Sequence, residues 1–316
     1  MKAIQFKSFD ALEFVELPMP QCERDTALVQ IKSASVNPSD VKNVKGHFTH
    51  TSLPRIPGRD FSGVVVDGPA DWIGAEVLGT GGDIGFTMDG THAEYIKIPV
   101  GALVRKPSNL SHEQAAAIGV NFLVAWLGTV EYARLKAGET IAVIGAGGGV
   151  GGAVTQIAKA IGTRVIGIDR HLPSSESPAA GRIDDFVKFD ESTVENVKRI
   201  TGGVDVVYDT VGGIAFEMAL SLAKRRGRVV EISATGRRRV EFDLIDFYHN
   251  ETRLFGTDSA KLGVAEAARY MAEICHGFET RQFAAPLIEH RFALEDAHQA
   301  YEAVANGTRG RVVINL

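Results

Sequence analysis

Several features are scarce or missing in this chain of 316 residues. It has two cysteines, Cys22 and Cys275, which is too few for a disulfide scaffold or a four-cysteine zinc site. No run of about 18 apolar residues occurs, so no membrane-spanning helix is expected, and residues 1–10 lack the apolar core of a signal peptide. The formal net charge of −5 gives no general attraction to nucleic acid or anionic membranes. We therefore expect a cytoplasmic protein that binds neither.

The first third of the chain has the pattern of an antiparallel β domain. Short segments alternate apolar and polar residues, and Gly and Pro separate them. The expected strands are Ala3–Phe6, Leu12–Leu17, Ala27–Lys32, Gly63–Asp67, Glu76–Gly79 and His92–Pro99.

From residue 111 onward, strands alternate with helices. Ser111 and Gln114 form a capping box that predicts a helix start. Short apolar runs rich in Val and Ile then predict parallel strands buried on both faces, with helices between most of them, which is the pattern of a doubly wound α/β domain. These strands are Ile141–Ile144, Val165–Asp169, Asp185–Phe189, Val204–Asp209, Arg228–Ile232 and Arg253–Gly256.

The end of the chain returns to the first pattern. Helices are expected over Gly263–Cys275 and Leu294–Ala305, and Gly310–Leu316 reads as a closing strand. No helix follows that strand to extend the α/β unit. We therefore assign residues 1–112 and 258–316 to the β-rich domain and residues 113–257 to the α/β domain.

A glycine-rich turn between strand and helix predicts a dinucleotide site. Such a turn brings backbone N–H groups and a helix N-terminus against a pyrophosphate. Two registers of the glycine fingerprint remain open, one on Gly147, Gly149 and Gly152 and one on Ala146, Gly148 and Gly151. The candidate contacts are Ala146, Gly147, Gly148, Gly149, Val150 and Gly151.

Two adjacent residues bear on the choice of cofactor. Asp169 ends the second strand, where a carboxylate accepts the ribose hydroxyls of NADH and repels a 2′-phosphate. Arg170 follows directly and offers a partner for the 2′-phosphate of NADPH. The sequence favours NADH slightly, and a helix N-cap is the structural alternative for Asp169.

The order of segments resembles the medium-chain dehydrogenase/reductase superfamily, and several motifs are similar to its zinc-free quinone and enone oxidoreductase branch. The resemblance covers nearly the whole chain and implies an α/β fold, with a GroES-like β-rich catalytic domain and a Rossmann domain with a doubly wound parallel sheet. The motifs are Ser35–Lys42, Pro57–Val65, Ala93–Tyr95, Gly145–Gly151 and Val207–Gly212.

The resemblance also tests for zinc. Zinc alcohol dehydrogenases of this superfamily place a cysteine where this chain has Asn37 and a histidine where it has Arg59. Neither asparagine nor arginine normally binds zinc, and the four-cysteine lobe is missing. We expect no metal site.

A lysine is the candidate that polarises the substrate carbonyl. Lys42 lies in a motif similar to that of plant enone oxidoreductases, whose equivalent lysine lies beside the nicotinamide and the substrate. Bacterial quinone reductases carry tyrosines there and at Phe48, a departure that favours enones. Asn37 and Asp40 are expected to shape the same site, with a turn held by local hydrogen bonds as their structural alternative. Asp60 reads as structural.

The nicotinamide end of the cofactor is expected at loops that follow two parallel strands. Ligands of such sheets bind beyond the carboxyl ends of the strands, which selects Thr210 and Val211 after one strand and Ser233 after another. The resemblance adds Asn121.

Together these features predict a zinc-independent NAD(P)H-dependent reductase of quinones or α,β-unsaturated carbonyls. One alternative is a trans-acting enoyl-thioester reductase, for which the basic run Arg237–Arg239 gives thin support. The other is a non-enzymatic cofactor-binding protein of the same fold. Family resemblance implies a homodimer, formed through an edge strand such as Arg253–Gly256.

Overall fold

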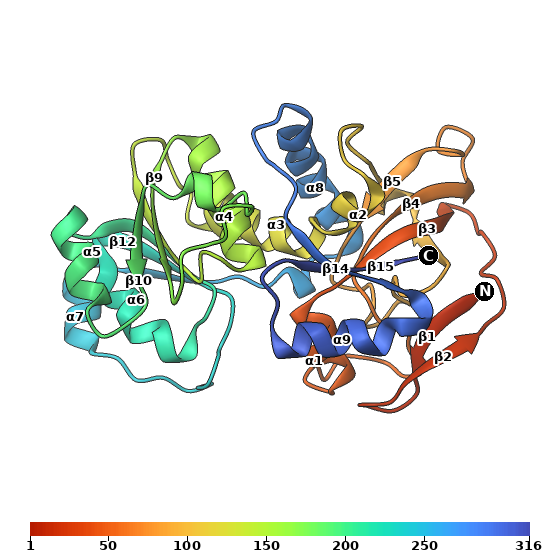
Figure 1. Cartoon of the computed structure of the whole chain (residues 1–316), viewed down its shortest axis with the longest axis horizontal. Coiled ribbons are helices and arrows are strands. Elements are labelled where there is room, and N and C mark those ends of the chain that lie inside the picture. Colours follow the sequence, from red (N-terminus) through yellow and green to blue (C-terminus); the bar gives the residue numbers. More distant parts are fainter. The chain divides into compact units, whose positions relative to one another are not determined.

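The computed structural model describes all 316 residues and divides them into two compact units. The first unit comprises Met1–Leu123, Ser259–Arg281 and Ala285–Leu316, and the second comprises Val124–Asp258 and Gln282–Ala284. Figure 1 follows the chain from the first unit into the second and back. The units are cut within helix α3 (Gly119–Trp126), and the division into independent domains at residues 112 and 258 stays a prediction.

The first unit is built around a mainly antiparallel sheet of seven strands. Its order is β14-β15-β3-β4-β5-β7, with β6 paired to β3. The exception to the antiparallel pattern is β14, which pairs with β15 in parallel. The strands are β3 (Thr26–Val36), β4 (Asp60–Asp67), β5 (Glu76–Gly79), β6 (Tyr95–Pro99), β7 (Val104–Arg105), β14 (Ile288–Ala293) and β15 (Arg311–Asn315).

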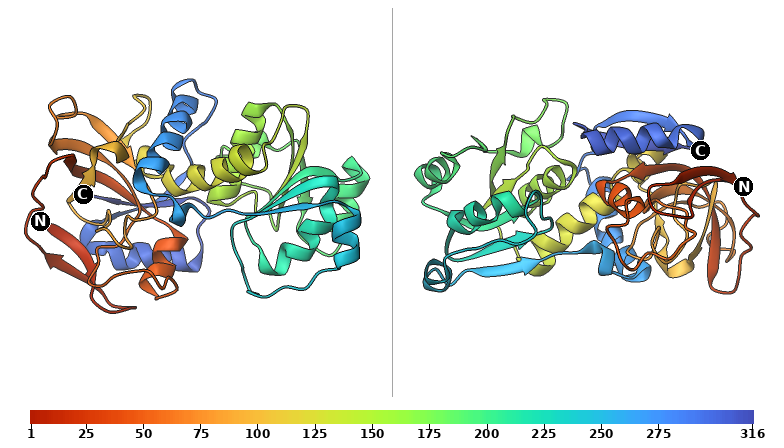
Figure 2. Two further views of the ribbon diagram at one scale, coloured as in Figure 1. Left: turned by 180° about the vertical axis from the view of Figure 1, so that it is seen from behind. Right: turned by 90° about the horizontal axis from the view of Figure 1, so that it is seen from below.

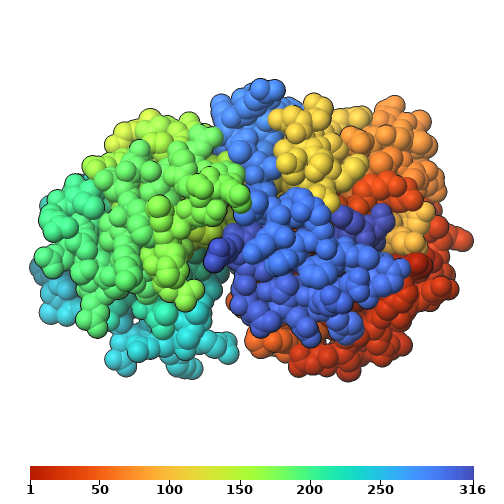
Figure 3. Space-filling view, viewed as in Figure 1, coloured from red at the N-terminus to blue at the C-terminus, as the bar shows by residue number.

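The first and the last segments of the chain both belong to this first unit. A hairpin of β1 (Lys2–Phe6) and β2 (Leu12–Glu16) opens the chain, and helix α9 (Ala297–Asn306) packs against helix α1 (Pro38–Val44) in the view from behind in Figure 2. The space-filling view in Figure 3 shows the late, blue residues lying against the early, red ones. Helices α2 (His112–Ala116) and α8 (Val264–Glu279) complete the unit.

The second unit contains a six-stranded sheet, and every pair of neighbouring strands in it is parallel. The order β10-β9-β8-β11-β12-β13 is that of a doubly wound α/β fold, as the sequence predicted. The strands are β8 (Thr140–Ile144), β9 (Arg164–Asp169), β10 (Asp185–Lys188), β11 (Val204–Asp209), β12 (Ala223–Glu231) and β13 (Arg253–Gly256).

Helices connect these strands as the alternating pattern predicted. They are α4 (Gly149–Ile161), α5 (Thr193–Thr201), α6 (Phe216–Leu222) and α7 (Leu244–His249). The core between sheet and helices is fully apolar at its centre, where Ile144, Ile166 and Val207 are 0% exposed. None of the chain's helices is both long and apolar enough to cross a membrane.

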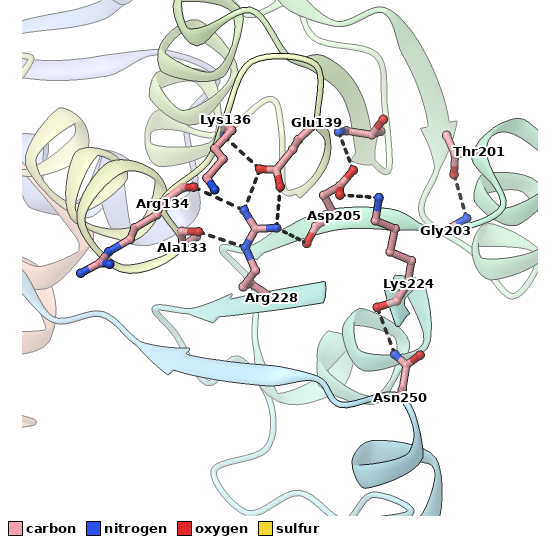
Figure 4. Close-up of polar contacts among 11 residues, drawn as sticks. Ala133, Arg134, Lys136, Glu139, Thr201, Gly203, Asp205, Lys224, Arg228 and Asn250 are labelled. Atoms are coloured by element: carbon pink, nitrogen blue, oxygen red, sulfur yellow. Dashed lines mark hydrogen bonds and ion pairs between the residues drawn. The ribbon is translucent and has the colours of Figure 1, made fainter. Parts of the chain in front are cut away.

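Partly exposed charged side chains connect the amino ends of the central strands (Figure 4). Arg228 on β12 donates to Glu139 Oε2 at 2.7 Å, to Glu139 Oε1 at 2.9 Å and to the Ala133 carbonyl at 3.0 Å. Asp205 on β11 accepts from the Thr140 N–H of β8 at 3.0 Å and pairs with Lys224. These polar contacts fix the edge of the sheet opposite to the one that carries the predicted cofactor residues.

Several observed element bounds differ from the expected ones by a few residues, and the sequence analysis did not expect strand β14. The capping box of Ser111 and Gln114 is present and confirmed. However, β12 begins at Ala223 rather than at Arg228, and β6 begins at Tyr95 rather than at His92. In both places the sequence carries polar or charged residues that obscure the start of the strand.

Candidate functional site

The predicted site residues fall into two groups, one in each compact unit. The second unit contains the glycine turn and the other predicted cofactor residues Asp169, Arg170, Thr210, Val211 and Ser233. Asn37, Asp40, Lys42 and Asn121 belong to the first.

The glycine turn leaves its helix N-terminus free to bind an anion. Helix α4 begins at Gly149 after Gly148, and no side chain caps its first N–H groups. Those donors, together with the positive end of a helix of 13 residues, make the local chemistry that binds a phosphate group. The residues present therefore fit the pyrophosphate of a dinucleotide.

One glycine of the turn cannot carry a side chain. A Cβ at Gly151 would lie 2.1 Å from the carbonyl oxygen of Gly145, whereas a Cβ at Gly152 would meet nothing closer than 3.5 Å. Gly151 is thus where helix α4 packs closely against the turn, which favours the register on Ala146, Gly148 and Gly151 over the alternative.

Gly151→Ala is expected to weaken NAD(P)H binding at least tenfold and to lower the free energy of unfolding by about 1–3 kcal/mol, because the added methyl group forces the turn to move. Gly152→Ala is the matched control on the same helix, since its methyl group has room. Fluorescence titration and thermal unfolding measure both effects. Equal behaviour of the two variants would show that the packing at Gly151 is not needed.

Asp169 braces the glycine turn. Its Oδ2 accepts from the Gly147 N–H at 2.9 Å, and its Oδ1 accepts from the Arg170 N–H at 2.7 Å. No helix begins after Asp169, so the alternative of a helix N-cap is wrong. The side chain is partly exposed, as is needed for a ribose contact, and Arg170 beside it is exposed.

The loops after β11 and β12 are tied to one another and to the glycine turn. Thr210 Oγ1 donates to the Ile144 carbonyl at 2.8 Å, and the Val211 carbonyl accepts from the Thr235 N–H at 2.9 Å. Gly212 pairs with Ala234 in an isolated bridge. Thr210, Val211 and Ser233 therefore lie at one edge of the sheet, on connected backbone.

In the first unit, a buried carboxylate organises the surroundings of Asn37. Asp60 is 0% exposed, and its Oδ2 accepts from Ser35 Oγ at 3.1 Å and from Asn37 Nδ2 at 2.9 Å. The N–H of Val120, in the first turn of α3, donates to both oxygens at 3.0 and 3.1 Å. This dense set of donors supports the structural interpretation of Asp60.

A buried arginine from the last strand completes this network. Arg311 is 7% exposed and donates to Asn37 Oδ1 at 2.6 Å and to Ser35 Oγ at 3.1 Å. With the Asn121 amide oriented so that its oxygen faces the guanidinium, that oxygen accepts from Arg311 Nε at 3.0 Å and Nη1 at 3.2 Å. Both polar atoms of the Asn37 amide are therefore used within the protein, and Asn121 keeps its amide N–H₂ for other partners.

Asp40 and Lys42 stand in contrasting environments on the short helix α1. Asp40 is 1% exposed; its Oδ2 accepts from the Asn37 N–H at 2.8 Å, and its Oδ1 has no partner. Burial raises the pKa of Asp40 to about 7, although the Asn37 N–H and the charge of Arg59 oppose the shift. Lys42 is exposed, and no hydrogen bond joins it to Asp40.

The residues at the positions where zinc alcohol dehydrogenases carry zinc ligands, Asn37 and Arg59, do not fit a zinc ion. The Asn37 amide N–H₂ donates to Asp60, and its amide oxygen accepts from Arg311, so neither atom is left for a metal. Arg59 is 2% exposed and places a guanidinium, 5.4 Å from the Phe86 ring centre, where a ligand would be needed. The structure contains no group of three or more His, Cys, Asp or Glu side chains that is arranged to hold a metal.

The sequence analysis gave no role to two buried polar residues of this region, Arg59 and His92. Arg59 Nε has no hydrogen-bond partner, and its two terminal nitrogens reach only Ser39 and Ser259 at 3.5 Å. His92 lies between the Tyr301 hydroxyl at 3.0 Å and the Ser35 carbonyl at 3.2 Å, and burial lowers the pKa of His92 to about 4. Such contacts between distant segments leave no local pattern in the sequence.

Two family models match the chain. Residues 23–108 match the alcohol dehydrogenase GroES-like domain, and residues 149–274 match the zinc-binding dehydrogenase model. A zinc-type alcohol dehydrogenase-like protein of Schizosaccharomyces pombe is 37% identical over 276 residues, which is 86% of this chain and 82% of that protein. The chain belongs to the medium-chain dehydrogenase/reductase superfamily, in its quinone and enone oxidoreductase branch.

Further relatives cover most or all of the chain. A human quinone oxidoreductase is 26% identical over 100% of this chain and 98% of its own length. A 2-methylene-furan-3-one reductase of Solanum lycopersicum is 31% identical over 74% of this chain and 62% of its own. An alcohol dehydrogenase superfamily protein of Novosphingobium aromaticivorans has a structure with a TM-score of 0.90, 28% identity, and coverage of 100% of this chain and 99% of that one.

Proposed function

We propose that this protein is a zinc-independent reductase that uses NAD(P)H to reduce quinones or α,β-unsaturated carbonyl compounds. The relatives named as a quinone oxidoreductase and a 2-methylene-furan-3-one reductase support this proposal. The observation that carries it is the uncapped N-terminus of α4 behind Gly148, with Gly151 packed against Gly145. This helix end in the second unit can hold a phosphate group, and no group of three or more His, Cys, Asp or Glu side chains in the structure could hold a metal ion.

The second unit is proposed to hold the cofactor by its phosphates and its ribose. The N–H groups of Gly149 and Val150 bind the pyrophosphate, Asp169 accepts from the adenosine ribose, and the loops with Thr210, Val211 and Ser233 bind the nicotinamide end. NAD(P)H, when bound, supplies a hydride to the substrate.

Lys42 is proposed to stabilise the charge that develops on the substrate oxygen. An enone that accepts hydride at its β-carbon becomes an enolate, so a cationic donor near the carbonyl oxygen lowers the barrier. Lys42 is suited to this role because its ammonium group is exposed and has no partner within the protein. Asn37 and Asp40 are proposed to hold the segment that carries Lys42, through the Asn37 N–H bond to Asp40 and the Asn37 amide bond to Asp60.

The direct test is oxidation of NADH and NADPH by the purified protein with a small panel of enones and quinones. The proposal expects turnover with at least one substrate of these classes and no loss of kcat after dialysis against a metal chelator. It is wrong if the protein neither binds nor oxidises either cofactor with any member of the panel. Loss of kcat on chelation, restored by zinc, would refute zinc independence alone.

The choice between NADH and NADPH is proposed to rest on Asp169. Asp169→Asn keeps an oxygen for the Gly147 N–H but removes the charge, so NADH is expected to bind about tenfold more weakly while NADPH binding improves or holds. Asp190→Asn, at an exposed position after the next strand, is the control. Fluorescence titration with both cofactors measures the ratio. An unchanged ratio in Asp169→Asn would show that another residue selects the cofactor.

A cluster of exposed arginines supports the alternative function, reduction of enoyl thioesters. Arg237, Arg238 and Arg239 are all exposed on the loop that follows β12. An acidic carrier protein or the phosphates of a thioester cofactor would be attracted to such a cluster. A thioester substrate that is reduced faster at low salt than at high salt, with free enones unaffected, would favour this second function.

We also propose that the protein forms a homodimer through strand β13. Strand β13 is an edge strand of the parallel sheet, and nearby Ile245, Tyr248 and Leu254 are 60%, 60% and 41% exposed. Pairing of this edge with a second copy would cover these apolar side chains, and sedimentation velocity would detect the dimer. The cytoplasmic location stays a prediction.

A further inference from the structure

Two carboxyl side chains lie next to one another at the cofactor edge of the parallel sheet. Asp209 ends β11, Glu231 ends β12, and the two residues are direct partners in the register of these strands. Asp209 is 0% exposed and Glu231 is partly buried. The sequence analysis gave neither residue a role, because their proximity depends on the register in which two successive strands pair, and the sequence pattern does not define that register.

Each carboxyl has one buried oxygen that no N–H, O–H or cation satisfies. These atoms are Asp209 Oδ2 and Glu231 Oε1. Two buried carboxylates side by side would repel one another, whereas one proton between them gives an O–H···O⁻ bond. Such a proton would satisfy the unpaired oxygens.

The surroundings supply no positive charge to replace that proton. The adjoining strands place Ile144 of β8 and Gly256 of β13 beside the pair, and the chain after β13 adds Thr257. The loops add Val211, Gly212 and Ser233, none of which titrates. Burial and the neighbouring Asp209 together raise the pKa of Glu231 to about 9, and Asp209 is the charged group that acts on it. Burial also raises the pKa of Asp209.

The other oxygen of Asp209 holds the loop that follows β11. Asp209 Oδ1 accepts from the Val211 N–H at 2.8 Å and from the Gly212 N–H at 2.9 Å. Gly212 then packs so closely on the second loop that a Cβ there would lie 1.9 Å from the Ser233 carbonyl oxygen. On the opposite side, Thr210 covers Gly145, where a Cβ would lie 2.2 Å from Thr210 Oγ1.

We propose that Asp209 and Glu231 share one proton at neutral pH, and that this proton positions the loops that bind the nicotinamide end of NAD(P)H. Glu231 donates the proton to Asp209 Oδ2, and Asp209 Oδ1 orients the N–H groups of Val211 and Gly212. Alkali removes the proton to solvent and leaves two adjacent carboxylates, whose repulsion displaces Asp209 and loosens the loops around Thr210 and Ser233. Asp209 and Glu231 are positioning residues, and the inference rests on the proposed function because that function assigns these loops to the cofactor.

The test compares the pH dependence of cofactor affinity in the wild type and in Glu231→Gln. In the wild type, the Kd for NADH or NADPH is expected to rise about tenfold between pH 8 and pH 10, as the fraction of protein with the shared proton falls. Glu231→Gln carries a permanent N–H donor to Asp209, so its Kd should stay at the neutral value over the same range. Glu217→Gln, at an exposed carboxyl on α6, should keep the wild-type profile.

A cofactor-independent measurement separates this inference from the proposed function. Infrared difference spectra of wild type against Glu231→Gln at pH 7.5 should contain the C=O band of a protonated carboxyl, lost in the wild type above pH 10. Presence of that band with no cofactor binding at any pH would refute the proposed function and retain the shared proton. Absence of the band, or a Glu231→Gln affinity that falls with pH as in the wild type, would overturn the inference. Asp209→Asn, which also supplies a permanent N–H donor, should match Glu231→Gln; if it follows the wild-type profile, the inference is likewise overturned.

Discussion

Lys42→Ala is expected to lower kcat for an enone about 10²–10³-fold, the typical cost of removing one donor from a developing oxyanion. The Kd for NAD(P)H should not change, because Lys42 is not among the predicted cofactor contacts. Stability should also be unchanged, because the Lys42 side chain is exposed and makes no hydrogen bond, while the hydrogen bond that its backbone carbonyl accepts from the His47 N–H is kept in the variant. Single-turnover kinetics with saturating cofactor separate the hydride-transfer step from binding.

The matched control for this variant is Lys45→Ala. Lys45 is also exposed and follows helix α1 directly, so it carries a similar charge on the same segment. If Lys45→Ala and Lys42→Ala reduce kcat equally, the effect comes from the overall positive charge of this segment and not from a specific contact of Lys42. If Lys42→Ala retains full kcat, Lys42 does not polarise the substrate, and Arg59, with its unpartnered Nε, becomes the next group to test.

Asp60→Ala is expected to cause the largest loss of stability, about 3–5 kcal/mol in the free energy of unfolding. Four donor contacts converge on this carboxylate, from Ser35, Asn37 and the Val120 N–H. Its removal leaves those donors unsatisfied and leaves the buried guanidinium of Arg311 without its strongest counter-charge. Urea unfolding, followed by fluorescence and circular dichroism together, measures the change.

Asp67→Asn at the exposed end of the same strand is the control, and its expected effect is below about 0.5 kcal/mol. A loss in Asp60→Ala no greater than in this control would mean that the network around Asn37 contributes little to folding. The activity of Asp60→Ala is expected to fall as well, because Asn37 and helix α1 lose their anchor.

The cofactor half of the molecule was readable from the sequence because its signals are local. The strand over 141–144, the glycine turn and the following helix are contiguous in the sequence. Because they occur in the order that a dinucleotide site requires, the pattern of each one supports the prediction of the other two. Only the register remained open, since it depends on how closely helix α4 approaches the carbonyl of Gly145. That distance is a property of the packed turn and is not encoded in the spacing of glycines.

The buried polar network could not be predicted, because its members come together through long-range contacts. Arg311 reaches Asn37 across 274 positions of the chain, and its basic side chain in a closing strand reads as a solvated edge residue. The Asn37 amide is therefore part of a buried framework, a role that its motif alone did not reveal. The pairing of Asp209 with Glu231 was missed for another reason, because it depends on the register of two successive strands. The parallel pairing of β14 with β15 was missed because β14 itself was not expected.

The central claim is hydride transfer from the nicotinamide to the substrate. NADH or NADPH carrying deuterium at the transferred position of C4 should be mixed with an enone, and the product examined by mass spectrometry and NMR. The account predicts one deuterium at the β-carbon of the saturated ketone, with one cofactor oxidised for each product formed. Cofactor consumption without deuterium in the product, or no consumption with any enone or quinone, would contradict it.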